Sequence, residues 1–177
     1  MLFRSLLRAI KKLSPYKAPS PDRIPNAVFK NCADTLTPHL LHIYKAVFLL
    51  NTYYPAWQEF NTVVLRKAGK PDYSVPKAYR PIALLNTTAK LLTTIVTDNM
   101  SHLIETNHLL SSTHFGGRPG RSITDSLHLL EATVKNTWQM RKTVSALFLD
   151  IKGAFPNAVT DRLLHNMRKR KLPDSLV

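Results

Sequence analysis

The stretch ALFLDIKGAF, residues 146–155, places a single carboxylate, Asp150, at the end of an apolar run. The run extends from residue 143 to residue 151, and a nearly continuous apolar run of this length predicts a central strand buried on both faces. A charged side chain where such a strand emerges must be solvated, paired or bound to a metal ion. The simpler alternative is a turn former or helix cap, so Asp150 on its own leaves both interpretations open.

Outward from this run, apolar residues recur at every third or fourth position through most of the chain, which predicts helices. One short strand, at residues 62–65, precedes a basic turn. The expected fold class is therefore α+β, mainly helical with few strands. The helices are expected at residues 1–13, 26–32, 36–50, 84–105, from 121 or 122 to 138, and 157–171.

The net charge of the chain indicates which classes of partner it can bind. The 177 residues include 25 Lys and Arg against 11 Asp and Glu, a formal net charge of +14. This imbalance favours a polyanionic partner, either nucleic acid or an anionic membrane surface. No apolar run approaches the roughly 20 residues that cross a bilayer. A single cysteine, Cys32, excludes a disulfide scaffold and a cysteine-based zinc site. The acids are scattered, so a metal site must be assembled by folding or be incomplete.

Three basic segments stand out in the sequence. Residues 115–121 form a turn rich in Gly, Pro and Arg, and residues 1–13 form a basic amphipathic segment without acids. The latter has the character of a mitochondrial leader, but a helix of the folded domain is favoured because such leaders are usually longer and Ser-rich. The segment 66–80 is either a solvated hairpin tip or a phosphate-gripping loop, and charge alone does not separate the two. Its five basic residues are Arg66, Lys67, Lys70, Lys77 and Arg80.

Five short motifs follow one another along the chain. They are KAPSPD at 17–22, PAW at 55–57 with VVLRKAGK at 63–70, YRPIALLN at 79–86, FGGRPGRS at 115–122 and LDIKGAF at 149–155. In this order they resemble the reverse transcriptase domain of non-long-terminal-repeat (LINE-like) retrotransposons. The resemblance covers nearly the whole chain, and its specificity lies in the order of the motifs rather than in any one of them.

The resemblance implies RNA-templated DNA synthesis by nucleotidyl transfer with two divalent ions, Mg²⁺ or Mn²⁺. It makes Asp150 the catalytic carboxylate and, with the carbonyl of Ile151, a metal ligand; Phe155 then excludes a ribose 2′-hydroxyl by bulk. The implied partners are an RNA template, an RNA–DNA duplex and deoxynucleoside triphosphates, with no membrane. The nucleotide-binding set is Lys67, Lys70, Arg80, Ile151 and Phe155, and the template-binding set is Arg118, Arg121 and Ser122.

The family's second catalytic motif, Tyr-x-Asp-Asp, is not found in the 177 residues, and one carboxylate cannot hold two ions in the required geometry. We therefore expect an incomplete right-hand polymerase fold, an N-terminal fragment inactive by itself, with fingers at 1–142 and the start of the palm at 143–177. Two alternatives stay open: a noncatalytic basic nucleic-acid-binding protein and an inert remnant of a mobile element. A nuclear or cytoplasmic location is expected over a mitochondrial one, and the oligomeric state is left open.

Overall fold

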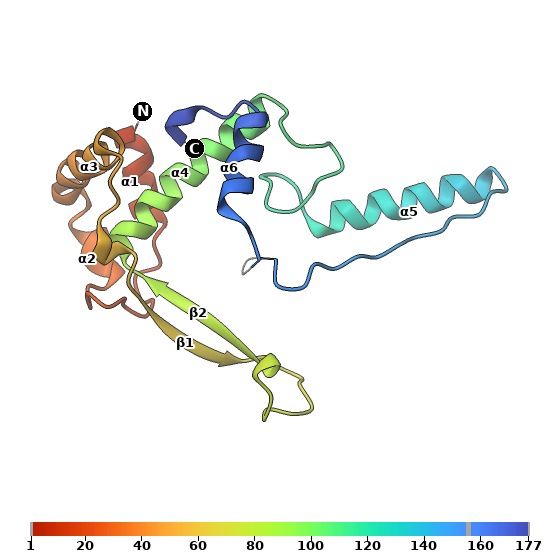
Figure 1. Ribbon diagram of the computed structural model, residues 1–177, viewed down its shortest axis with the longest axis horizontal. Coiled ribbons are helices and arrows are strands. Elements are labelled where there is room, and N and C mark those ends of the chain that lie inside the picture. The colour runs from red at the N-terminus through yellow and green to blue at the C-terminus, as the bar shows by residue number, and fades with distance from the viewer. Residues whose placement is uncertain (1, 155–156, 177) are drawn as a thin grey trace. The chain divides into compact units, whose positions relative to one another are not determined.

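The chain forms two compact units, residues 1–98 and 99–177, in a computed structural model that describes residues 2–154 and 157–176 (Figure 1). Within these residues the structure has six α-helices and one two-stranded antiparallel sheet, which confirms the α+β class. The predicted functional boundary between residues 142 and 143 is a different division from this one and stays a prediction. Short 3-10 turns lie at Pro55–Trp57, Pro76–Ala78 and Asp174–Leu176.

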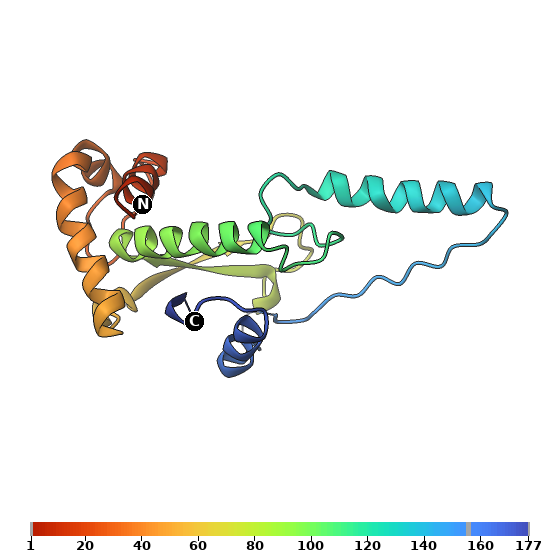
Figure 2. The ribbon, with the colours of Figure 1, turned by 90° about the horizontal axis from the view of Figure 1, so that it is seen from above.

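The core of the first unit lies among four helices. Helices α1 (Leu2–Lys12), α2 (Asn26–Asn31) and α3 (Ala33–Leu50) gather around the first turns of α4 (Thr87–Thr106), as Figures 1 and 2 show. Each element buries the apolar stripe that its periodicity predicts, because only packing offsets the entropy of ordering a helix. The most deeply buried large side chains are Leu6, Ile10, Tyr44, Leu91 and Ile95.

The N-terminal helix α1 belongs to this core, which confirms the interpretation favoured from the sequence. Its residues Leu6, Ala9 and Ile10 are buried, and the helix packs on α3. A helix whose apolar face supplies part of the hydrophobic core is a structural element of the domain. The exposed side chains described on this helix are Phe3 and the basic residues Arg4, Arg8, Lys11 and Lys12.

A β-hairpin leaves the helical core. Strand β1 (Phe60–Arg66) pairs with β2 (Tyr79–Leu85), with Val63 opposite Ile82 and Leu65 opposite Arg80. The predicted strand at 62–65 is confirmed and longer than expected. Its partner β2 was missed, because the apolar residues at its end continue the periodic pattern of α4.

The predicted start of the fourth helix at residue 84 is wrong, because Asn86 separates β2 from α4. The Asn86 side-chain oxygen accepts a hydrogen bond from the Thr88 amide at 2.8 Å, and the Asn86 carbonyl accepts one from the Lys90 amide at 3.0 Å. An Asn in this position caps a helix and satisfies amides that have no partner within its first turn. The cap is therefore the physical reason why the strand ends and the helix begins here.

The second unit contains the end of α4 together with α5 (Ile123–Gln139) and α6 (Thr160–Lys169). Helix α5 begins where the sequence predicts, since Ser122 and Asp125 form a capping box. The Ser122 hydroxyl accepts a hydrogen bond from the Asp125 amide at 3.2 Å, and the Asp125 carboxylate accepts one from the Ser122 amide at 2.7 Å. Helix α6 is shorter than the predicted 157–171.

The predicted central strand at residues 143–151 is wrong in this structure. The segment that follows α5 has no regular secondary structure (Figure 1). Its side chains Leu147, Phe148 and Leu149 are all more than four-fifths exposed. A strand exists only when a neighbouring strand accepts and donates its backbone hydrogen bonds. Among the described residues β1 and β2 pair only with each other, so this apolar segment has no partner.

Candidate nucleic-acid interface

The first cluster of predicted site residues lies at the end of the β-hairpin. Side chains directly opposite each other in an antiparallel pair share a face, and alternate residues of one strand share it too. Arg80 is opposite Leu65, and Lys67 lies two residues beyond Leu65, where its amide continues the ladder to the Ala78 carbonyl at 2.8 Å. The register therefore places Lys67 and Arg80 on the same face, with Lys70 exposed in the loop beyond them.

The loop that joins the two strands is held by its own side chains. The Tyr73 hydroxyl donates to the Lys67 carbonyl at 2.8 Å, and the Tyr79 hydroxyl donates to the Tyr73 carbonyl at 2.9 Å. Asp72 accepts hydrogen bonds from the Ser74 amide and hydroxyl, both at 2.7 Å, and these bonds lower the pKa of the Asp72 carboxyl. The Lys67 ammonium donates to the Lys77 carbonyl at 2.8 Å. The sequence left a hairpin tip and a phosphate-binding loop open for this segment. The structure shows a hairpin, and phosphate binding by its cations stays a prediction.

A second cluster links two of the sequence motifs that resemble the reverse transcriptase domain. Asp22 of KAPSPD accepts a hydrogen bond from the side-chain amide of Asn86 of YRPIALLN at 2.5 Å. The other carboxylate oxygen accepts from the buried Ser20 hydroxyl at 3.1 Å and from the Ile24 amide at 3.0 Å. Asp22 thus ties the proline-rich loop to the junction that ends β2. Sequence reasoning assigned neither Asp22 nor Asn86 to the site.

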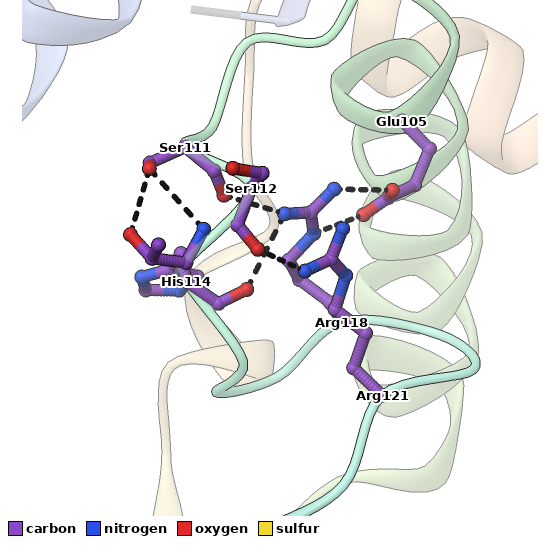
Figure 3. Close-up of polar contacts among 7 residues, drawn as sticks. Glu105, Ser111, Ser112, His114, Arg118 and Arg121 are labelled. Atoms are coloured by element: carbon purple, nitrogen blue, oxygen red, sulfur yellow. Dashed lines mark hydrogen bonds and ion pairs between the residues drawn. The ribbon is translucent and has the colours of Figure 1, made fainter. Parts of the chain in front are cut away.

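The third cluster holds the Gly-rich turn against the end of α4 (Figure 3). Arg118 is 9% exposed. Its guanidinium donates to both Glu105 carboxylate oxygens, at 2.8 and 2.7 Å, and also to the Ser111 and His114 carbonyls, at 2.8 and 3.3 Å. A bidentate, charge-assisted pair of this kind fixes geometry strongly. Arg118 therefore fixes the conformation of the loop between α4 and α5. Glu105, the acid that binds Arg118, was not identified from the sequence.

The other two predicted template residues lie directly after this anchored turn. Arg121 donates to the Ser112 carbonyl (Figure 3). Its guanidinium lies over the Phe115 ring at 5.5 Å from the centroid. Ser122 is the cap of α5, and its hydroxyl donates to the Asp125 carboxylate at 2.7 Å. The structure thus brings Arg118, Arg121 and Ser122 into one turn. Template contact by these side chains stays a prediction.

We expect acid to loosen the turn anchored by Arg118. The Arg118 hydrogen bonds lower the pKa of the Glu105 carboxyl below its ordinary value of 4.5. A lowered folded-state pKa means that the stabilising contribution is complete above 4.5 and is lost as the pH falls through the lower, folded value. Backbone amide chemical shifts of residues 107–121, followed by NMR from neutral pH downward, should report this transition.

The matched control compares two carboxylates whose pKa values are both lowered, Glu105 and Glu131. Glu105→Gln should shift the amides of residues 107–121 already at neutral pH and remove most of their pH dependence. Glu131 pairs with Lys135 at 2.6 Å on the exposed side of α5, so Glu131→Gln should leave the turn unchanged. Unaltered amides in Glu105→Gln would show that the pair does not hold the turn.

The predicted catalytic segment lies in the second unit. Asp150 and Ile151 are exposed in the irregular segment after α5, and Phe155 lies outside the described residues. Within residues 2–154 and 157–176, no three His, Cys, Asp or Glu side chains gather where they could hold a metal ion. The donor set does not fit a pair of divalent ions, which need several converging carboxylates. None of the described helices is long and apolar enough to cross a membrane.

Comparison with known proteins finds the same family that the ordered motifs resemble. Residues 65–177, more than half of the chain, match the family described as reverse transcriptase (RNA-dependent DNA polymerase). The chain is 27% identical, over 93% of its length, to a probable RNA-directed DNA polymerase from transposon BS of Drosophila melanogaster. It is 26% identical over 94% to the corresponding protein of transposon X-element from the same fly, and 23% identical over 93% to the RNA-directed DNA polymerase from mobile element jockey of Drosophila funebris. It spans 18% of the length of each of these relatives.

Proposed function

Because the chain belongs to the reverse transcriptase (RNA-dependent DNA polymerase) family, we propose that it forms the part of such an enzyme that receives the incoming nucleotide and the RNA template. The observation that carries the proposal is the shared face of Lys67 and Arg80 on the hairpin, within the matched residues. A flexible ammonium and a forked guanidinium on the same face of a hairpin suit the oxygens of a triphosphate. Lys70 adds a third cation in the loop.

The remaining predicted roles extend this proposal to the second unit. Arg121 and Ser122 contact the template from the turn that the buried Arg118 anchors, and Asp150 contributes one carboxylate to nucleotidyl transfer. Phe155 excludes the ribose 2′-hydroxyl. The complete enzyme is of the non-long-terminal-repeat retrotransposon type, acts on RNA and deoxynucleoside triphosphates, and uses Mg²⁺ or Mn²⁺. The order of the five motifs supports this assignment.

A noncatalytic nucleic-acid-binding function is the second candidate. It is favoured by the net charge of +14 and by the absence, within the described residues, of a cluster that could hold a metal ion. The two candidates differ in one property that can be measured: only the first binds deoxynucleoside triphosphates at the hairpin.

Photolabelling with a photoreactive deoxynucleoside triphosphate tests the proposal. We expect label in the hairpin, and competition by unlabelled deoxynucleotide. Lys70→Gln/Arg80→Gln should lower labelling by at least about tenfold, because hydrogen bonds to charged groups contribute roughly 1.5–3 kcal/mol each. Neither residue forms an ion pair in the described part of the chain, so the substitution leaves no acid unpaired.

The control variant, Lys45→Gln/Lys142→Gln, removes the same charge from exposed positions on other elements and should label like the wild type. Equal labelling of both double variants would assign the label to nonspecific attraction and favour the noncatalytic candidate.

A further inference from the structure

Helix α1 has a second face that packing in the core leaves exposed. Leu6, Ala9 and Ile10 are 0–3% exposed. The exposed residues on the other side are all basic except Phe3; they are Arg4, Arg8, Lys11 and Lys12. The two faces follow from the 3.6-residue period, which places residues four apart in one row.

The cations of this face have no acidic partners. Helix α1 contains no acid, and within the described chain none of its four cations takes part in an ion pair. Arg4, Arg8, Lys11 and Lys12, with Leu7, line a shallow groove of about 360 Å³. Four residues of helix rise about 6 Å and three rise about 4.5 Å, so Arg4, Arg8 and Lys11 follow one another in similar steps along the groove. A row of unpaired cations at regular spacing fits a row of phosphates.

An unusually exposed aromatic ring follows the helix. Tyr16 is 95% exposed and lies four residues beyond the end of α1, next to the exposed Lys17. The turn that carries it is anchored, because the side-chain amide of Asn26 donates to the Ser14 carbonyl at 2.8 Å. An aromatic ring exposed to water, with a lysine next to it in the sequence, is the kind of side chain on which unpaired bases stack. Bases in a duplex are already stacked, so the ring favours a single strand.

Two polyanionic partners were expected from the charge, nucleic acid and an anionic membrane surface. Burial of the apolar face of α1 favours nucleic acid. A helix that lies in a membrane interface inserts its apolar face among the acyl chains. In α1 that face packs against α3 in the core. Only the basic face of α1 can therefore contact a ligand, and a phosphate backbone is a ligand that needs no apolar contact.

We propose that the basic face of α1 and the ring of Tyr16 bind a single strand of nucleic acid. Arg4, Arg8 and Lys11 contact successive phosphates, and one base stacks on Tyr16. This site deepens the proposed function, because the strand it fits is the single-stranded RNA template. The site lies outside residues 65–177, so the family match does not include it.

Salt dependence of binding to a single-stranded RNA oligonucleotide tests the phosphate contacts. For single strands the slope of log K against log salt changes by roughly 0.7 for each phosphate that the protein no longer neutralises. Arg4→Gln/Arg8→Gln/Lys11→Gln should therefore lower the slope by about 2. Lys45→Gln/Lys135→Gln/Lys142→Gln carries the same net charge but removes exposed cations of α3, α5 and the following segment, and should keep most of the wild-type slope. Circular dichroism confirms that both triple variants are folded.

Stacking is tested by a separate pair of substitutions. Tyr16→Phe keeps the aromatic face and should bind like the wild type, whereas Tyr16→Ala should weaken binding by roughly tenfold. The loss should be larger for the single strand than for the same sequence as a duplex.

Three results would overturn the inference. One is an equal reduction of slope in both triple variants, which would indicate attraction by net charge alone. Another is equal binding by Tyr16→Phe and Tyr16→Ala. The third is binding of α1 to vesicles of phosphatidylserine and phosphatidylcholine while RNA binding is unaffected by the α1 substitutions. Nucleotide labelling at the hairpin is a separate measurement, so this inference can fail while the proposed function stands.

Discussion

No deoxynucleotide should be incorporated when the 177-residue chain acts alone on a primed RNA template, whether Mg²⁺ or Mn²⁺ is supplied. Asp150 is exposed in a segment without regular structure, and no metal-holding cluster is found in the part of the chain that the structure describes. A single carboxylate holds a divalent ion only loosely, with water completing the coordination. We expect product formation indistinguishable from a reaction without protein.

Adding the missing motif on a second polypeptide tests whether Asp150 takes part in the reaction. Incorporation should return when a separate polypeptide carrying the Tyr-x-Asp-Asp part of a related reverse transcriptase is added. In that mixture Asp150→Asn should lower the rate by about 10³-fold or more, since losing several kcal/mol of transition-state stabilisation has that effect. Asp161→Asn, which neutralises another exposed acid of the same unit, should leave the rate unchanged.

Two outcomes would contradict the prediction. Incorporation by the chain alone that disappears in Asp150→Asn would mean that other acids of this chain, or a second copy of it, complete the site. Complemented activity that survives in Asp150→Asn would remove Asp150 from the reaction.

Tyr44→Ala should lower the free energy of unfolding by about 4 kcal/mol. Tyr44 is 0% exposed, packs edge-to-face on Trp57 with ring centroids 6.0 Å apart, and donates its hydroxyl to the Thr88 carbonyl at 2.7 Å. Truncation leaves a cavity between α3 and α4 and removes the hydrogen bond to the Thr88 carbonyl. A loss of this size is a large fraction of the roughly 5–15 kcal/mol that stabilises a domain.

The measurement is urea unfolding followed by tryptophan fluorescence. The chain has two tryptophans, so a Trp138→Phe background leaves Trp57, the direct neighbour of Tyr44, as the reporter. Tyr16→Ala is the matched control, because it removes the same side chain from a 95% exposed position and should change stability by less than about 0.5 kcal/mol. Equal effects of the two substitutions would show that Tyr44 is not part of a packed core.

The Tyr44 hydroxyl also predicts sensitivity to alkali. Burial, with a smaller contribution from Tyr53, raises the pKa of Tyr44 above its ordinary value of 10.0. The stabilising contribution is therefore complete below pH 10 and is lost as the pH rises above that value toward the folded-state pKa. Tyr44→Phe, which keeps the ring, should reduce this alkaline loss while lowering stability at neutral pH by only about 1 kcal/mol.

Most helices could be predicted from the sequence because their signals are local. Periodic apolar residues mark α1 and α3, and the cap formed by Ser122 marks the start of α5. The errors arose where local signals were ambiguous. The apolar end of β2 runs into the stripe of α4, and the apolar run at 143–151 predicts burial without specifying a partner. Strand pairing depends on residues distant in sequence, which a local pattern does not contain.

The candidate site shows the same division. Charge and the turn signal marked the basic segment that contains Lys67, Lys70 and Arg80, and the family resemblance selected these three residues. The second strand of their hairpin was missed. The contacts that position the motifs were not predicted either. Asp22 meets Asn86 across 64 positions of sequence, and Arg118 meets Glu105 across 13. Nothing in the sequence around Asp22 or Glu105 predicts which residue each acid contacts.

The sequence by itself determined the family, the excess of positive charge and the position of most helices, because each of these depends on residue identity, order or local spacing. Only the tertiary structure decided which cations are available to a ligand. The sequence gives no reason to distinguish Arg118 from Arg8, yet folding buries the Arg118 guanidinium against Glu105. Arg8 is exposed on α1 and forms no ion pair within the described part of the chain. The availability of a charge depends on what the fold places beside it, because a nearby carboxylate satisfies the same donors that a phosphate would.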